Sequence, residues 1–336
     1  NDKCYFFKNL LFIDMRKLFP DYLIITLKGL AMGAADVVPG VSGGTIAFIS
    51  GIYQELIDSI NNVNLSVLKT LKKEGLKAAW QQVNGSFLLA LLTGIGISIL
   101  TFSKVITHLL ETQPILVWSF FFGLIIASIA LIWKETSNWK IVDILALIIG
   151  IALSYYITIA RPVSSPDSYW YLFLSGFIAI IAMILPGISG AFILLLMGSY
   201  ETVIGTINQF RDGLVNFNTE VLGQAILKLG VFAIGAIIGL KSFSKVLHWM
   251  FEKHKNTTLA LLIGFMAGSL NKVWPWKQVL ETRINSHGEV VPYIDKSILP
   301  QNFDGQPQIL TAIILAIIGF IVIFGMEKLA AKLGKN

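Results

Sequence analysis

One apolar stretch, residues 33–57 (GAADVVPGVSGGTIAFISGIYQELI), contains residue types that interrupt a helix and expose its backbone. Pro39 disfavours helix at the residue before it and removes one backbone donor, and Gly40 permits turn geometry that other residues resist. Ser42 is then a natural N-cap for a second helix that starts at Gly43 and runs through GGTIAFISGIY. The stretch therefore predicts a broken helix inside a segment of membrane-like composition.

The second arm of this broken helix has the residue types of an anion site at its start. The backbone N–H groups of Gly43, Gly44 and Thr45 have no partner within a helix that begins there. Because the two glycines carry no side chain, a ligand can approach this backbone closely, and the helix dipole favours an anion. Together with Ser42, these residues predict a binding site for a phosphate or a carboxylate.

Nearly the same break recurs at residues 180–204 (IIAMILPGISGAFILLLMGSYETVI), where Gly187, Ser189 and Gly190 stand at the corresponding positions. A structural alternative is that Pro-Gly pairs kink membrane helices and that a duplication copied the kink. Two copies, each with serine and glycine after the break, favour a binding site. The freed backbone donors need partners, and lipid tails cannot supply them.

Three charged residues near the breaks each have two interpretations. Asp36 is the only acid deep in the first broken segment, which predicts coupling to protons or sodium ions, or else a carboxylate that braces the broken backbone. Lys28 either pairs with an anionic head group or extends to the membrane interface. Arg161 precedes the second break, where it either meets an incoming anion or is an ordinary solvated loop charge.

The composition is that of an integral membrane protein. Of 336 residues, 55% are hydrophobic and 14% are charged, whereas soluble domains carry about 25% charged residues. Membrane topology accounts for the net charge of +6, so no nucleic-acid partner is expected. One cysteine, four scattered histidines and no phosphate-binding loop of the GxxxxGKS type predict no metal site, no cofactor and no ATP.

An internal repeat organises the chain, since residues 29–61 align with 176–208. Apolar runs of about spanning length follow in each half, at 87–101, 115–133, 141–160, 225–240, 257–274 and 309–326. We predict a single membrane domain that is all-α and polytopic, with two inverted-topology repeats. Each repeat is a re-entrant broken-helix hairpin plus three transmembrane helices. The expected parts are an interfacial N-terminal helix (1–21), repeat 1 (22–160) and repeat 2 (169–327), which contains an extracellular loop (275–308).

Lysine and arginine gather in the segments that this topology places on one side of the membrane, for example Lys69, Lys72, Lys73 and Lys77. Because such residues mark the inner side, both termini are expected in the cytoplasm.

The two motifs MGAADVVPGVSGGTIAFISGIYQELI and LPGISGAFILLLMGSYE resemble the polyprenyl-phosphate transporter family, over roughly residues 25–330. The resemblance implies a multi-pass protein of the bacterial cell membrane that returns undecaprenyl phosphate from the outer to the cytoplasmic leaflet. The lipid carrier is then reused for peptidoglycan and other envelope polymers. The match is strongest from Asp36 to Thr45, and the second motif departs from it at Ala191 and Phe192.

Two other functions are alternatives to lipid transport. Undecaprenyl-pyrophosphate phosphatases have a motif of the PGxSRSG form with an arginine on the phosphate, but this chain has PGVSGG and PGISGA. Phosphoryl chemistry needs charge stabilisation and proton transfer, and those residues are missing here. A transporter or channel for small inorganic or organic anions would use the same site, and only the resemblance speaks against it. The oligomeric state stays open.

Overall fold

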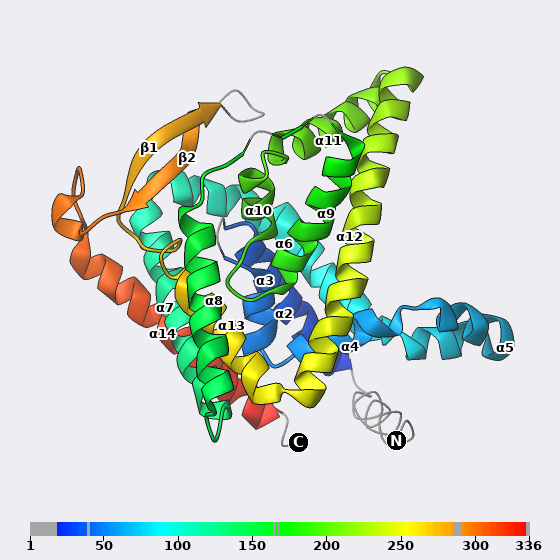
Figure 1. Ribbon diagram of the computed structural model, residues 1–336, viewed down its shortest axis with the longest axis horizontal. Coiled ribbons are helices and arrows are strands. Elements are labelled where there is room, and N and C mark those ends of the chain that lie inside the picture. The colour runs from blue at the N-terminus through cyan, green and yellow to red at the C-terminus, as the bar shows by residue number, and fades with distance from the viewer. Residues whose placement is uncertain (1–18, 39–40, 164, 167, 285–289, 334–336) are drawn as a thin grey trace.

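The computed structural model describes residues 19–38, 41–163, 165–166, 168–284 and 290–333, which form a helical bundle with one small β-hairpin (Figure 1). The first half supplies α2 (Phe19–Asp36), α3 (Gly43–Ile49), α4 (Tyr53–Asn62), α5 (Leu65–Gln82), α6 (Gly85–Thr112), α7 (Pro114–Glu135) and α8 (Ile141–Ile159). The second half supplies α9 (Tyr169–Ile184), α10 (Gly190–Leu196), α11 (Tyr200–Val215), α12 (Thr219–Lys253), α13 (Lys255–Ser269), β1 (Lys277–Ile284), β2 (Val290–Ser297), the short helix η1 (Pro300–Asn302) and α14 (Ile309–Leu333).

Four helices of the described chain, α6, α7, α8 and α12, are long and apolar enough to cross a membrane. The bent pair of α10 and α11 makes a fifth candidate if it is one span, and its two helices meet at 108°. Helix α9 and residues 309–325 of α14 are shorter apolar helices. The structure therefore confirms a helical, multi-pass membrane protein with a broken helix pair.

The two halves repeat their element order and their packing. Helix α2 packs on α6, and α9 packs on α12 in the same way. Between the halves, α7 packs on α14 and α8 packs on α13. Glycines permit close backbone contact in both intra-half pairs, because a Cβ at Gly94 would collide with the carbonyl oxygen of Thr26, and one at Gly235 with that of Phe173.

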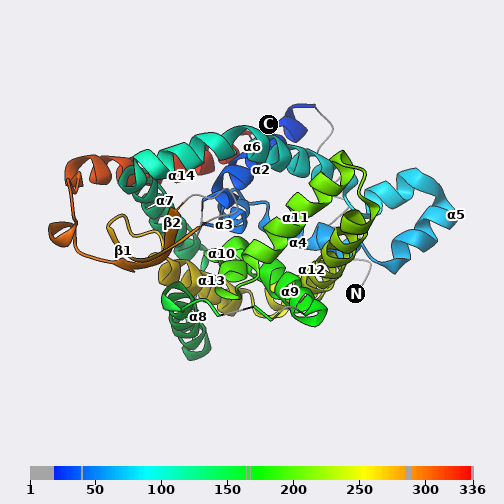
Figure 2. The ribbon, with the colours of Figure 1, turned by 90° about the horizontal axis from the view of Figure 1, so that it is seen from above.

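The two broken hairpins, α2–α3–α4 and α9–α10–α11, occupy the middle of the bundle. In both ribbon views α3 and α10 lie in the interior (Figure 1, Figure 2). In Figure 1, α11 lies toward the upper edge and α4 toward the lower edge. Residues that flank the first break, including Val38, Val41 and Ala47, are among the most completely buried apolar residues. The core of the protein is therefore centred on the helix breaks, away from the lipid-facing surface.

The second arm of each hairpin is itself broken, contrary to the predicted continuous helix through GGTIAFISGIY. Helix α3 ends at Ile49, and α4 begins only at Tyr53. Between them Gly51 has a positive φ of 74°, and Gly198 repeats this with a φ of 66° between α10 and α11. Glycine adopts this left-handed geometry without steric cost, and it ends a helix where it does so.

The segment 275–308 corrects the all-α prediction, because it folds into an antiparallel β-hairpin of β1 and β2. Valine, isoleucine, threonine and tyrosine are frequent in the two strands, and such residues favour a pleated, half-buried surface. Two tryptophans anchor the hairpin: Nε1 of Trp274 donates to the carbonyl oxygen of Ile298 (2.8 Å), and Nε1 of Trp276 to that of Pro307 (2.8 Å).

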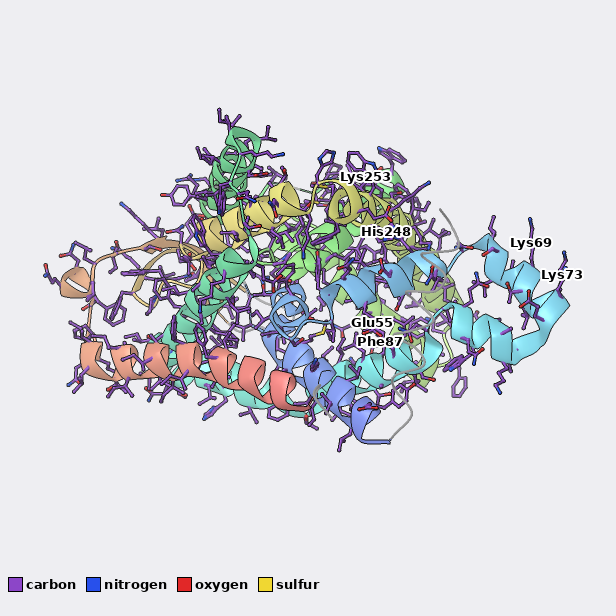
Figure 3. All side chains as sticks on the ribbon, turned by 90° about the horizontal axis from the view of Figure 1, so that it is seen from below. Glu55, Lys69, Lys73, Phe87, His248 and Lys253 are labelled. Carbon is purple, nitrogen blue, oxygen red and sulfur yellow. The ribbon has the colours of Figure 1, made fainter. Side chains whose placement is uncertain are left out.

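The N-terminal part of the predicted interfacial helix, residues 1–18, lies outside the described residues, and residues 19–21 belong to α2. A second exposed element is α5, which projects from the bundle and bends at Gly75 (φ 87°). Lys69 and Lys73 lie on its projecting end (Figure 3).

Polar contacts fix the first hairpin to the second half. Nδ1 of His248 on α12 lies 2.6 Å from Oδ1 of Asp58 on α4. The Lys241 ammonium donates to the carbonyl oxygens of Ile60 and Asn61 at 2.6 and 2.9 Å. The Lys241 ammonium thereby adds a positively charged donor to carbonyl groups in the last turn of α4, where a helix has fewer backbone partners.

Candidate functional site: the paired helix breaks

The two breaks contact each other directly. The Ser42 hydroxyl donates to the carbonyl oxygen of Met183 (3.0 Å), and the backbone N–H of Gly187 donates to Oγ1 of Thr45 (3.0 Å). The Tyr53 hydroxyl donates to the carbonyl oxygen of Ile184 (3.2 Å). All three side chains from the first half are buried. Side chains of the first hairpin therefore supply partners for backbone groups that the second break frees, as an apolar interior requires.

The first backbone N–H groups of α3 donate to acceptors within the first hairpin. The N–H of Gly43 donates to Oδ1 of Asp36 (2.6 Å), and the N–H of Gly44 donates to the Ser42 hydroxyl (3.1 Å). The N–H of Thr45 donates to the carbonyl oxygen of Ser42 (2.9 Å). Ser42 is the N-cap of α3. In this arrangement the carboxylate of Asp36 occupies the place at which the sequence predicts an external anion.

The absence of side chains at Gly43 and Gly44 has a packing reason. A Cβ at Gly43 would collide with the Asp36 carboxylate. A Cβ at Gly44 would lie 2.5 Å from the carbonyl oxygen of Ile184, in the second break. The two glycines let the capping acid and the other half of the protein approach α3.

The second break differs from the first in its charge and its turn. Gly187 has a positive φ of 88°, and a Cβ there would lie 2.9 Å from the carbonyl oxygen of Phe265. Ser189 caps α10 through a longer bond, 3.4 Å from the N–H of Phe192. A Cβ at Gly190 would lie 2.7 Å from the carbonyl oxygen of Ala179. Met183 stands where the first break has its acid, so the capping arrangement is not repeated.

The remaining predicted residues lie away from this contact. The Lys28 ammonium donates to the carbonyl oxygen of Ser50 (2.7 Å), which is at the far end of α3 from the break. Arg161 is exposed in the connection between α8 and α9. Pro39 and Gly40 lie outside the described residues.

The structure adds a small pocket beside the second break that the sequence did not predict. Its polar and aromatic lining residues are Ser154, Thr158, Gly187, Ser189, Phe192 and Lys272. Ser154 and Thr158 come from α8, and Lys272 follows α13, so distant segments meet there. The available signal was Lys272 itself, a lysine at the end of an apolar, glycine-interrupted run.

Lys272 belongs to a charged cluster between the pocket and the β-hairpin. Its ammonium lies 3.2 Å from each carboxylate oxygen of Asp295 and 4.6 Å above the ring of Phe192. Lys277 lies 3.5 Å from the same carboxylate. Burial and the neighbouring Lys272 lower the pKa of Lys277 to about 8, against the opposing effect of Asp295. Burial alone would raise the pKa of Asp295, but Lys277 and Lys272 together hold it below its usual value.

A helical membrane protein with two broken helices that meet in its core has the construction of a membrane transporter. The comparisons agree with this class. The family model described as undecaprenyl phosphate translocase-like matches residues 32–291. A polyprenyl-phosphate transporter of Vibrio cholerae is 45% identical over 316 residues, covering 93% of this chain and 98% of the relative. A polyprenyl-phosphate transporter of Staphylococcus aureus is 34% identical over 262 residues, covering 74% of this chain and 85% of the relative.

The chain therefore belongs to the undecaprenyl phosphate translocase-like family. This confirms the family that the two motifs resemble and places the chain among transporters rather than among enzymes. No solved structure matches the chain.

Proposed function

We propose that this protein returns polyprenyl phosphate, and undecaprenyl phosphate in particular, from the outer to the cytoplasmic leaflet of the bacterial cell membrane. The returned carrier is reused for peptidoglycan and other envelope polymers. The names of the two relatives support the substrate class. One structural observation carries the proposal: the two helix breaks are joined to each other in the core, through Ser42, Thr45 and Gly187.

The two halves act as inverted repeats in this proposal, with both termini in the cytoplasm. Two observations support an inversion (Figure 1). Helix α2 packs on α6 as α9 packs on α12, and α4 and α11 lie toward opposite edges of the bundle. A movement of one half against the other separates the breaks and breaks the bonds between them. The hydroxyls of Ser42 and Thr45 and the N–H of Gly187 then become donors for the phosphate, while the isoprenoid tail stays in lipid.

Asp36 is the coupling residue in this mechanism. Its carboxylate and the lipid phosphate are both anions, and they compete for the N–H of Gly43. A proton or a sodium ion that neutralises Asp36 weakens its hold on that N–H and favours the phosphate. The head group and the cation then move together, which gives transport a driving force that needs no ATP.

Proteoliposomes with labelled undecaprenyl phosphate test the proposal, by following head-group accessibility from outside and free phosphate together. We expect protein-dependent exchange between leaflets with no phosphate release, and slower exchange in Ser42→Ala. Release of free phosphate would instead indicate a phosphatase. Exchange of small anions without lipid exchange would show that the substrate is an inorganic or organic anion and not a lipid.

A further inference from the structure

The pocket beside the second break contains a hydroxyl that the fold does not use. Ser154 is 1% exposed, and its Oγ has no hydrogen-bond partner among the described residues. Serines in the neighbouring α7 behave differently, since Ser119 and Ser128 donate to carbonyl oxygens four residues earlier, at 2.6 and 2.5 Å. A buried hydroxyl without a partner costs free energy, so a ligand that pairs with it gains stability.

The same pocket borders a charge cluster that lacks one anion. The ammonium groups of Lys272 and Lys277 share the single carboxylate of Asp295, so the cluster carries one uncompensated positive charge. Lys272 is 12% exposed, and buried charges are ordinarily paired. Since Lys277 lies 3.5 Å from Oδ2 of this carboxylate, Asp295 keeps a partner when Lys272 turns to another anion.

The β-hairpin holds this cluster over the second hairpin. Asp295 and Lys277 lie on β2 and β1, respectively. On β1 the guanidinium of Arg283 forms an ion pair with Glu201 on α11 and lies 5.4 Å over the ring of Tyr200. The hairpin is thus attached at both the pocket and the N-terminal end of α11, and it lies on the opposite side of the bundle from α4 (Figure 1).

We propose that this pocket is the binding site for the head group of the transported lipid, a phosphate monoester. Lys272 exchanges its bond with Asp295 for one with a phosphate oxygen, and the hydroxyls of Ser154 and Ser189 donate to the others. The assignment rests on the proposed transport of a phosphate-headed lipid and adds the site that receives it from the hairpin side. The neighbouring exposed side chains of Tyr155 and Ile159 on α8 contact the apolar tail.

Binding of farnesyl phosphate to the purified full-length protein tests the site, with inorganic phosphate and farnesol as comparison ligands. The variants are Lys272→Met, Lys272→Arg and Ser154→Ala, with Lys69→Met as the matched control on exposed α5. A bond to a charged group contributes about 1.5–3 kcal/mol, or roughly 10- to 150-fold in affinity. We expect losses of this order for Lys272→Met and Ser154→Ala, partial recovery in Lys272→Arg and no change in Lys69→Met.

Two controls separate a binding role from a structural role. Lys272→Met leaves Asp295 paired with Lys277, and Ser154→Ala removes a hydroxyl that has no partner among the described residues, so both variants keep the thermal stability of the wild type. Equal farnesyl phosphate affinity in all variants would overturn the site. Equal affinity of wild type for inorganic and farnesyl phosphate would overturn the lipid as its ligand. If the variants bind and exchange lipid as wild type does, the pocket is not the head-group site, and the proposed function stands. If the wild-type protein exchanges no lipid, the proposed function fails.

Discussion

The substitution Gly44→Ala tests whether the two breaks are in contact in the folded protein. The added Cβ would lie 2.5 Å from the carbonyl oxygen of Ile184, whereas ordinary van der Waals contact begins at 3.4 Å. The two breaks would therefore have to separate by about 0.9 Å. This movement also lengthens the bond from Tyr53 to the same carbonyl group, now 3.2 Å.

Overpacking of this kind costs about 1–3 kcal/mol. Gly96→Ala on α6 is the matched control, because nothing lies within 4 Å of a Cβ built there. In a helix interior that change stabilises by about 0.5–1 kcal/mol. Thermal unfolding in detergent should thus order the proteins as Gly96→Ala, wild type and Gly44→Ala, from most to least stable. If Gly44→Ala is as stable as Gly96→Ala, the breaks are not packed against each other and the reasoning is wrong.

Three further predictions concern the breaks and the hairpin. Tyr53→Phe removes the hydroxyl bonded to Ile184 and should lower the free energy of unfolding by about 1–3 kcal/mol, measured by thermal unfolding; an unchanged protein would show that this contact contributes nothing. Asp36→Asn should abolish the dependence of lipid exchange on external pH or sodium, measured in proteoliposomes with imposed gradients, and an unaltered dependence would leave Asp36 with a structural role. The pKa of Lys277 is about 8 in the folded protein and 10.5 when exposed, so the unfolded chain binds more protons between these values. The free energy of unfolding should therefore rise with pH across this window, and Lys277→Met should remove the rise; a wild type whose stability falls with pH there would contradict the buried ammonium.

Local sequence signals predicted the breaks well. Ser42 and Gly43 determine where α3 begins, because a serine favours the N-cap position and its side chain bonds to a backbone N–H only two residues away. Such a signal is local and can be recognised in the sequence. The second break within each arm was not predicted, although Gly51 and Gly198, whose positive φ ends the helix there, stand at corresponding positions of the repeat. The β-hairpin was missed as well, although β-branched and aromatic residues stand on either side of a glycine-containing segment.

What the sequence could not give was the contact between distant segments. The capping of Gly43 by Asp36 depends on the angle at which α2 meets α3, and no local pattern specifies that angle. The pocket needs α8, the second break and Lys272 to meet, and these are separated by dozens of residues. In isolation Lys272 is an ordinary lysine at the end of an apolar run. Its significance comes from burial beside a carboxylate that another lysine shares.

The central claim is that a phosphate head group crosses the protein at the paired breaks. A polyprenyl phosphate analogue with a photoreactive group next to its phosphate tests this most directly, after reconstitution, illumination and mapping of the labelled peptides. The account predicts labels at residues 41–45 and 183–190, reduced by excess unlabelled polyprenyl phosphate. Labels confined to lipid-facing residues such as Ile237 on α12, with none at either break, would contradict it.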